Sequence, residues 1–467
     1  MTDTRSSITI VGGGPCGLAA ALALARRGVA VDLVERSERL GGMAASIDVG
    51  GIRVDLGSHR LHPARSERVG ALLDDLLGDD LQVRPRNGRL RLHDRWLHFP
   101  LRFGELLTAL PPRAAAAAAF DLIGTMLPGR STATAASYAD VVRRGLGPSA
   151  LSTFHGPMAE KLWGVPPEQL SAELAHKRVS VRSPLALLRT LAKGDDERVF
   201  LSPRRGYGQI VDSLADAAVA AGATIRTGVG VERVVADETA PTVRLDDGTE
   251  LHPNRVLWTA PPDALLRAVD RAAAPDGVPH RALVLVFLVV PETQYLDVDA
   301  HYVPGLDVAF SRLSEPRNYR DGDDPEGRTV LCAEVPCTVG DETWAADDVA
   351  LGDLVLAGME ACGLRRPEVG DVVIERLPAV YPVIGVGEEE ARRETIARAE
   401  AAPGTTLLGR HGLVVPDNLH HVLEMGLTAA DCVALHSGDA AADGRSSWDN
   451  AAWQSARARF DDFVVED

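Results

Sequence analysis

The amino-acid sequence predicts an α/β fold in which a Rossmann-like dinucleotide-binding domain is joined to a second α+β domain. Three observations support this prediction. The chain has 467 residues, which exceeds the usual size of one domain. Its first apolar run leads directly into clustered glycines and a helix-like segment, as in a nucleotide-binding βαβ unit. Separate β-branched segments recur between residues 281 and 377, where they predict a second sheet.

The first domain opens with a strand, a helix and a second strand. Apolar spacing predicts them at residues 8–11, 18–27 and 30–35, and Gly28 ends the helix. Short β-branched segments around a glycine pair predict a hairpin over residues 46–56. The same periodicities return later and complete the domain. They predict helices at 209–221 and 423–435 and strands at 229–235, 242–245, 256–259 and 405–408.

The remaining segments are assigned to the second domain. Helical apolar spacing at 67–77, 114–127, 138–145 and 185–193, with a strand-like interruption at 96–101, predicts a helical insertion. Strands are predicted at 281–290, 308–312, 329–335 and 372–377. We therefore expect a discontinuous nucleotide-binding domain from residues 1–60, 200–265 and 403–440. Residues 61–199 and 266–402 would form the substrate-side domain.

Charge and cysteine content narrow the class of protein. The formal net charge of −17 repels a nucleic-acid backbone over most of the surface, so nucleic acid is not an expected partner. The five cysteines show neither a disulfide framework nor metal-ligand spacing, which predicts no metal site and favours a cytoplasmic location. No signal peptide and no transmembrane segment are expected, because the first segment is polar and no apolar run reaches about 18 residues.

A glycine cluster carries the nucleotide-binding prediction. The sequence GGGPCG at residues 12–17 matches GxGxxG. Gly12 permits a tight turn, Gly14 lets the backbone approach a pyrophosphate, and Gly17 lets the helix lie close to the sheet. Glu35 closes the second strand 18 residues after Gly17, where its carboxylate can accept hydrogen bonds from a ribose. The motif predicts a bound dinucleotide, and NAD and FAD both fit it at this point.

The segments after this motif are similar to a known family. ERSERLGGM at 35–43 and GIRVDLGSH at 51–59 resemble the FAD-dependent amine oxidase superfamily, and more narrowly its protoporphyrinogen-oxidase-like and UDP-galactopyranose-mutase-like branch. The similarity continues in EKLWGVP at 160–166, RRGYG at 204–208, VERV at 231–234, VLWTAP at 256–261, YP at 381–382, GRHG at 409–412 and NLHH at 418–421. It implies FAD as the cofactor, and therefore an FAD-binding Rossmann-like domain.

By this resemblance, residues from several segments would contact the cofactor. They are Gly12, Gly14, Pro15, Cys16, Gly17, Glu35, Arg36, Gly41, Gly42, Met43, Gly57, Ser58, His59, Val234, Gly409, Arg410, Asn418 and Leu419. One position departs from the pattern of the mutases. His420 stands where they have an acidic residue, which puts the family's ring contacts there in doubt.

Four residues are candidates for chemistry and substrate binding. By resemblance, His59 would lie beside the flavin and act as a hydrogen-bond partner or proton carrier, with a structural histidine as the alternative. Arg312 would hold an anionic substrate, unless it forms a structural ion pair. Trp163 and Tyr381 would line the pocket, although aromatic residues in apolar segments are also common in cores.

The preferred interpretation is an FAD-dependent oxidoreductase that oxidises or desaturates a small organic substrate by hydride transfer to the flavin. One alternative is a mutase-like isomerase, in which reduced flavin attacks a sugar without net redox change. A third is a binding protein that FAD merely stabilises. The expected partner is a small-molecule substrate, with anionic and sugar-derived compounds among the candidates.

Overall fold

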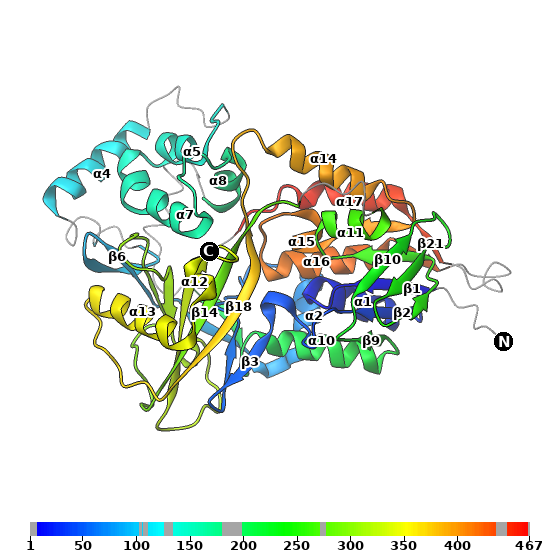
Figure 1. Cartoon of the computed structure of the whole chain (residues 1–467), viewed down its shortest axis with the longest axis horizontal. Coiled ribbons are helices and arrows are strands. Elements are labelled where there is room, and N and C mark those ends of the chain that lie inside the picture. Colours follow the sequence, from blue (N-terminus) through cyan, green and yellow to red (C-terminus); the bar gives the residue numbers. More distant parts are fainter. Residues whose placement is uncertain are drawn as a thin grey trace.

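The computed structural model describes residues 7–101, 105, 111–125, 134–179, 199–270, 277–435 and 446–465. Figure 1 shows two halves beside each other, one containing α1 (Pro15–Arg26) and the other containing α13 (Asp348–Ala361). The predicted helix at 185–193 and positions 126–127 of the predicted helix at 114–127 lie outside the described residues. Within the described ranges, no helix is long and apolar enough to cross a membrane.

The first half contains a five-stranded parallel sheet in the order β19-β13-β1-β2-β9. Its strands are β1 (Ser7–Val11), β2 (Ala30–Val34), β9 (Thr224–Arg226), β13 (Arg255–Trp258) and β19 (Thr405–Leu407). Ile8 and Ile10 of the central strand are buried, as expected for a parallel sheet covered by helices. The predicted βαβ unit is confirmed, and the strands predicted at 256–259 and 405–408 extend its sheet.

Helices α1, α10 (Gly208–Ala220) and α16 (Leu419–Asp431) pack together in this half. A Cβ at Gly426 would lie 2.3 Å from the carbonyl oxygen of Cys16, so α16 crosses α1 with backbone against backbone. α16 begins four residues before the predicted start at 423. Helix α2 (Glu67–Leu77), predicted as part of the insertion, packs here as well, because Val69 and Leu73 belong to the same core as α1.

Smaller elements complete the first half. The predicted hairpin is formed by β3 (Ser46–Val49) and β4 (Ile52–Asp55). A three-stranded sheet contains β10 (Val231–Val235), β11 (Thr242–Leu245) and β12 (Glu250–Leu251). The other elements of this half are η1 (Gly42–Ala44), η2 (Gly78–Asp80), α11 (Pro262–Val269), α14 (Glu389–Glu400), α15 (Gly409–Leu413), β20 (Val433–Leu435), β21 (Ser446–Trp448) and α17 (Asn450–Phe460).

The second half contains a seven-stranded sheet in the order β18-β14-β17-β16-β15-β6-β7. Its strands are β6 (Gly88–Leu92), β7 (Arg95–Phe99), β14 (His280–Val290), β15 (Ala300–Tyr302), β16 (Arg312–Ser314), β17 (Thr329–Cys337) and β18 (Asp371–Pro382). The strand predicted at 308–312 is wrong, because only Arg312 joins the ladder. Val308 and Phe310 are apolar because they pack in the core beside α13, and not because they pair with a strand.

Alternate residues of β14 face opposite sides of this sheet, as the period of a strand requires. Val284 and Val286 pack in the core that contains α13. Leu283 and Leu285 pack in a different core, which also contains hairpin β3–β4 and the helices between residues 138 and 179. The second face of the sheet is therefore directed toward the nucleotide half.

Between α2 and β8 (Val199–Pro203), the described residues contain three strands besides their helices, where the sequence predicted a single strand-like interruption. β5 (Leu81–Pro85) pairs with β8, and β6 and β7 join the seven-stranded sheet. The described helices are α4 (Pro112–Thr125), α5 (Tyr138–Gly145), α6 (Pro148–Ala150), the π-helix η3 (Leu151–His155), α7 (Gly156–Trp163) and α8 (Ala172–Arg178). The remaining helices of the second half are η5 (Pro316–Tyr319) and α12 (Glu342–Ala345).

Lys161 provides a test of the packing between α7 and the second sheet. Its buried ammonium donates to the carbonyl oxygens of Val303 (2.6 Å) and Phe310 (3.0 Å), and burial lowers its pKa to about 8. The folded state therefore disfavours the charged form, at a cost of about 3 kcal/mol that disappears as pH rises from 8 to about 10.4. The unfolding free energy of the wild type should therefore rise over this pH range, and Lys161→Met should abolish the rise. Urea denaturation of both proteins between pH 7 and 10.5 measures the difference. Parallel pH profiles would contradict it.

Candidate functional site

The glycine turn between β1 and α1 is shaped by contacts within the chain and leaves one side open. Gly12 has a φ of +107°, and a Cβ there would lie 2.1 Å from Oγ1 of Thr259. A Cβ at Gly17 would lie 2.1 Å from the carbonyl oxygen of Gly12. A Cβ at Gly14, which precedes Pro15 at the N-terminus of α1, would meet nothing within 4 Å. This open space at a helix N-terminus suits a pyrophosphate.

Glu35 lies beside this turn. Its Oε2 accepts a hydrogen bond from the backbone N–H of Gly13 (2.8 Å), and its Oε1 accepts from the backbone N–H (2.8 Å) and hydroxyl (2.9 Å) of Ser37. A carboxylate has about four acceptor positions, so a ribose hydroxyl could still be bound. The exposed Arg36 lies against Gly230, which immediately precedes β10. Val234 of β10, a predicted cofactor contact, is buried in the core. The two segments expected at the adenosine end are therefore neighbours.

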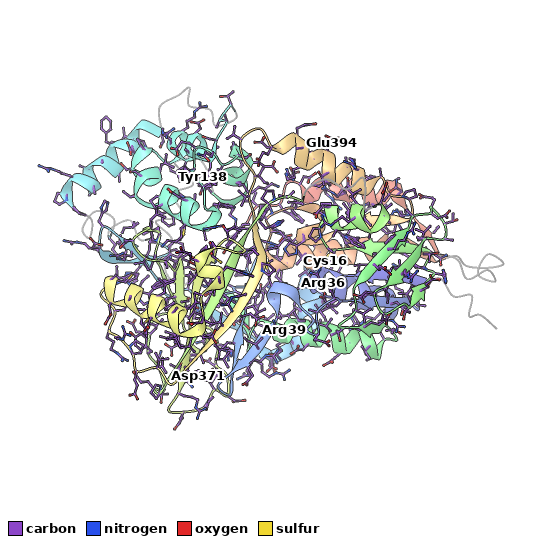
Figure 2. The ribbon with its side chains drawn as sticks, viewed as in Figure 1. Cys16, Arg36, Arg39, Tyr138, Asp371 and Glu394 are labelled. Carbon is purple, nitrogen blue, oxygen red and sulfur yellow. The ribbon has the colours of Figure 1, made fainter. Side chains whose placement is uncertain are left out.

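The segment after β2 lies across the glycine turn. The backbone N–H of Gly41 donates to the carbonyl oxygen of Gly13 at 2.8 Å. Gly41 has a φ of +101°, and a Cβ there would press against Val211 of α10. Arg39 forms an ion pair with Glu375 of β18 and so connects this segment to the second sheet. Figure 2 labels Cys16, at the start of α1, together with Arg36 and Arg39 in this region.

His59 follows the turn formed by the buried Gly57 and the half-buried Ser58. Its Nε2 lies 2.9 Å from the carbonyl oxygen of Met43 and 3.1 Å from that of Leu56. Because a carbonyl only accepts, Nε2 carries the proton and Nδ1 is the acceptor nitrogen. The ring stacks on Tyr207 with centroids 4.9 Å apart. Burial lowers the pKa of His59 although nearby carboxylates oppose it, so the imidazole is neutral near pH 7.

Arg312 and Glu334 form a bidentate ion pair on the sheet face directed toward this turn. Nε and Nη2 of Arg312 donate to the two carboxylate oxygens of Glu334 at 2.9 and 2.8 Å. Oε1 of Glu334 also accepts from the backbone N–H of Ser58 at 2.8 Å. Burial raises the pKa of Glu334, but Arg312 and Ser58 outweigh it and the net pKa is lowered. The charge of Arg312 is therefore balanced within the protein.

A second arginine lies next to His59. The guanidinium of Arg60 is 5.4 Å from the ring centroid of Phe200 and 5.2 Å from that of Tyr319, and Nη2 pairs with Asp299 at 3.0 Å. The ring of Tyr302 lies between Arg60 and Arg312, with centroid distances of 5.9 and 5.6 Å. This wall is aromatic and both of its arginines have acidic partners.

Trp163 and Tyr381 are brought together by the fold, with ring centroids 6.5 Å apart. Both are buried, and Nε1 of Trp163 donates to the carbonyl oxygen of Pro382 at 3.2 Å. The guanidinium of Arg178, at the end of α8, lies 5.5 Å from the Trp163 ring and 5.2 Å from the Tyr381 ring. Arg178 was not among the sequence candidates.

The C-terminal candidates lie against the start of α1. Gly409 has a φ of +79°, and a Cβ there would be 3.4 Å from Sγ of Cys16. Arg410 Nη1 donates to the carbonyl oxygen of Asp417 (2.9 Å) and to its Oδ1 (3.2 Å). Asn418 precedes α16, and its backbone N–H donates to Nδ1 of His421 at 3.2 Å. Leu419, the first residue of α16, is buried, as is His420.

Sequence reasoning missed Glu334, Arg178 and Asp417. A signal for Glu334 was present, because it is the only charged residue in TVLCAEVPC at 329–337, and a lone charge in a buried strand requires a partner. Arg178 and Asp417 match none of the sequence motifs, so only their tertiary contacts distinguish them.

The described residues fit the predicted FAD. Gly14 leaves room beside a helix N-terminus, and several buried polar atoms in the surrounding segments lack a partner. These atoms are Oγ of Ser58, Nε of Arg410 and Oδ2 of Asp417. Unsatisfied buried groups of this kind commonly mark a bound ligand or water. All five cysteines are buried and free, and no cluster of metal ligands occurs among the residues that the structure describes.

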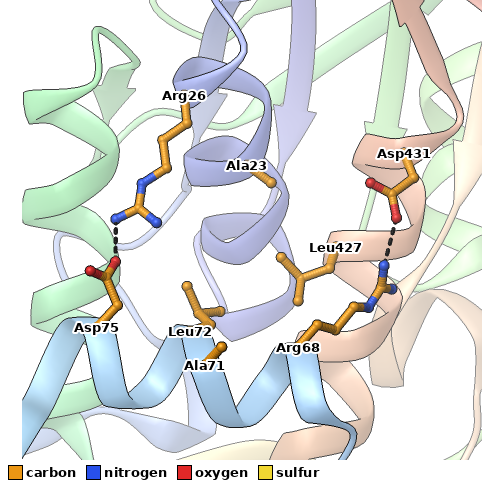
Figure 3. A pocket seen from close by; sticks show the side chains of 8 residues that line it. All are labelled: Ala23, Arg26, Arg68, Ala71, Leu72, Asp75, Leu427 and Asp431. Carbon is orange, nitrogen blue, oxygen red and sulfur yellow. Dashed lines mark hydrogen bonds and ion pairs between the residues drawn. The ribbon is translucent and has the colours of Figure 1, made fainter.

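An open groove of about 490 Å³ lies elsewhere, between α1, α2 and α16. Figure 3 shows its apolar floor and an ion pair at each end, Arg26 with Asp75 (2.7 Å) and Arg68 with Asp431 (2.5 Å). Its residues are Ala23, Arg26, Arg68, Ala71, Leu72, Asp75, Leu427 and Asp431. It includes the last turn of α1, whereas the predicted cofactor contacts surround the first turn, so we do not assign it to the site.

Known proteins resemble the chain over most of its length. Coproporphyrinogen III oxidase from Propionibacterium freudenreichii subsp. freudenreichii is 26% identical over 480 residues, covering 88% of each chain. A reduced UDP-galactopyranose mutase has a similar structure, with a TM-score of 0.77 and 22% identity over 91% of this chain and 95% of that chain. A protein provisionally named a protoporphyrinogen oxidase, from Exiguobacterium sp. 255-15, has a TM-score of 0.69 and 20% identity over 91% and 98% of the two chains.

These similarities confirm the predicted α/β fold. The model of the family described as flavin containing amine oxidoreductase matches residues 15–434, from the first turn of α1 to β20. The chain therefore belongs to the flavin-containing amine oxidoreductase family and uses FAD as its cofactor.

Proposed function

We propose that the chain is an FAD-dependent oxidoreductase that oxidises or desaturates a small organic substrate by removing hydride from it. The balanced charge of Arg312 is the observation that supports this most, because a guanidinium already bonded to Glu334 through Nε and Nη2 offers an anionic sugar nucleotide only a weak attraction. Two relatives point to redox chemistry. One is the coproporphyrinogen III oxidase, and the other is a carotenoid 3,4-desaturase of Haloarcula japonica, which matches over 73 residues at 45% identity and 15% of each chain.

The chain's own residues would bind, orient and shield the substrate. FAD, when bound, supplies the two-electron acceptor. His59 would face the reacting centre with Nδ1, since Nε2 is held between two carbonyl oxygens. Trp163 and Tyr381 would form an aromatic wall, with Arg178 over both rings. Because Glu334 balances its charge, Arg312 would offer the substrate a hydrogen-bond donor through Nη1, the nitrogen that its bonds to Glu334 do not use, and little net attraction for an anion.

Anaerobic addition of candidate substrates to the holoenzyme tests this proposal. We expect coproporphyrinogen III, or another reduced organic compound, to bleach the flavin absorbance. His59→Ala should slow that bleaching at least about tenfold, because it removes a group that positions or transfers a proton in the reaction. Arg459→Ala, at the exposed end of α17, is the matched control and should bleach at the wild-type rate. An unchanged rate in His59→Ala would remove His59 from the reaction.

The mutase alternative retains support from the fold, because the mutase structure has a TM-score of 0.77. It predicts turnover of UDP-galactopyranose only after dithionite reduction, with no net change in flavin absorbance. Turnover of that kind, without bleaching by any reduced substrate, would replace the oxidoreductase proposal. Retention of FAD with neither activity would favour the binding-protein alternative. The five free cysteines support a reducing compartment, so a cytoplasmic location remains part of the proposal.

A further inference from the structure

The ion pair between Arg410 and Asp417 has unused hydrogen-bonding groups. Asp417 is only 7% exposed, and both bonds that it accepts from Arg410 come from Nη1. Oδ2 of Asp417 and Nε of Arg410 are buried and have no partner. A buried polar group without a partner is unfavourable, so the pair is incomplete as it stands.

The incomplete pair lies where the cofactor-binding segments meet. Arg410 follows Gly409, which lies against Cys16 in the first turn of α1. Asp417 immediately precedes Asn418 at the start of α16. Burial is the main cause of the raised pKa of the Cys16 thiol, and the nearby charge of Asp417 raises it further. The unused atoms therefore belong to the region between the first turns of two long helices.

The chemistry of the unused atoms selects their partner. Nε–H of Arg410 needs an acceptor, whereas an ionised Oδ2 of Asp417 needs a donor. A phosphate or carbonyl oxygen would satisfy only Arg410, and a phosphate would be repelled by Asp417. A hydroxyl group both donates and accepts, so its chemistry suits either atom. The polyol chain of FAD provides such hydroxyls.

We propose that Asp417 is a positioning residue that accepts a hydrogen bond from a hydroxyl group of bound FAD, so that retention of the cofactor depends on the ionisation of this carboxylate. The proposal rests on FAD as the cofactor and not on the reaction that the enzyme performs. It therefore goes beyond the proposed function, and the two can fail separately.

The surroundings of Asp417 place its ionisation near neutral pH. Burial raises its pKa to about 6, although Arg410, Arg178 and Lys177 oppose this. The Cys16 thiol on α1 faces it and stays neutral, because burial raises its pKa far above the usual value. A protonated Asp417 no longer accepts the hydroxyl proton. We therefore expect FAD to be held more tightly above pH 6 than below it.

The rate at which the holoenzyme releases FAD tests the proposal without measuring activity. Release is monitored as the rise of FAD fluorescence after dilution into buffers between pH 5 and 8. The wild-type release rate should increase about tenfold from pH 7 to pH 5, as expected for loss of one charge-assisted hydrogen bond. Asp417→Asn should release FAD faster at pH 7 and show little pH dependence. Asp431→Asn, at the opposite end of α16, is the matched control and should match the wild type.

Arg410→Lys gives a second test that keeps the positive charge but removes Nε. It should release FAD faster than the wild type at pH 7 while retaining the pH dependence, because Asp417 is unchanged. A wild-type release rate that does not change between pH 5 and 8 would overturn the proposal, and this measurement does not depend on whether a variant folds. A pH profile for Asp417→Asn that matches the wild type would overturn it as well.

Discussion

Alanine at position 14 is expected to weaken FAD binding by more than about tenfold while leaving the apoprotein folded. The φ of Gly14 is −76°, which alanine adopts easily, and its Cβ would point into space where no protein atom lies within 4 Å. Replacing a glycine N-cap with alanine costs the helix about 1 kcal/mol or less. The added methyl group would instead occupy the space that the pyrophosphate needs beside α1.

Gly17 provides the contrast for this prediction. A Cβ at Gly17 would lie 2.1 Å from the carbonyl oxygen of Gly12, so Gly17→Ala must displace the turn and should lower the unfolding free energy by about 1–3 kcal/mol or more. Urea denaturation of the apoproteins and FAD titration by fluorescence quenching separate the two effects. Equal loss of stability in both variants, or full FAD affinity in Gly14→Ala, would disprove the assignment of Gly14 to the cofactor side.

Glu334→Ala is expected to lower the unfolding free energy by about 3–5 kcal/mol, because it leaves the largely buried Arg312 without its partner. It also removes the acceptor of the Ser58 backbone N–H and so loosens the turn before His59. Glu334→Leu combined with Arg312→Met should recover most of the stability, since neither charge then remains. Urea denaturation of Glu334→Leu, of Arg312→Met and of the double variant measures the coupling. Additive losses would show that the two side chains are independent.

The same pair predicts a pH dependence. The pKa of Glu334 is lowered below its ordinary value of 4.5, so its contribution to stability is present above pH 4.5 and is lost as pH falls through the folded pKa. Stability of the wild type should therefore decrease more steeply than that of the Glu334→Leu, Arg312→Met double variant below pH 4.5. Parallel acid denaturation curves would contradict this.

The nucleotide half could be predicted from the sequence because its signals are local. Strand β1, the glycine turn, α1 and Glu35 occur within about 30 consecutive residues, and each follows from side-chain period, backbone freedom or helix-terminus electrostatics. Local reasoning was wrong where tertiary packing determined the structure. Val308 and Phe310 have the composition of a strand but pack as a loop beside α13, and α2 joins the first half although the insertion was expected to contain it.

The sequence by itself determined that the chain binds a dinucleotide, and its resemblance to a family identified FAD. Tertiary structure alone decided which charges meet. Arg312 and Glu334 lie 22 residues apart in the sequence. Arg178, Trp163 and Tyr381, which lie together, come from three different elements. No spacing rule relates such residues, because electrostatic and aromatic contacts depend on distance in space after the sheets and helices have packed. The charge balance of Arg312 is therefore a property of the fold.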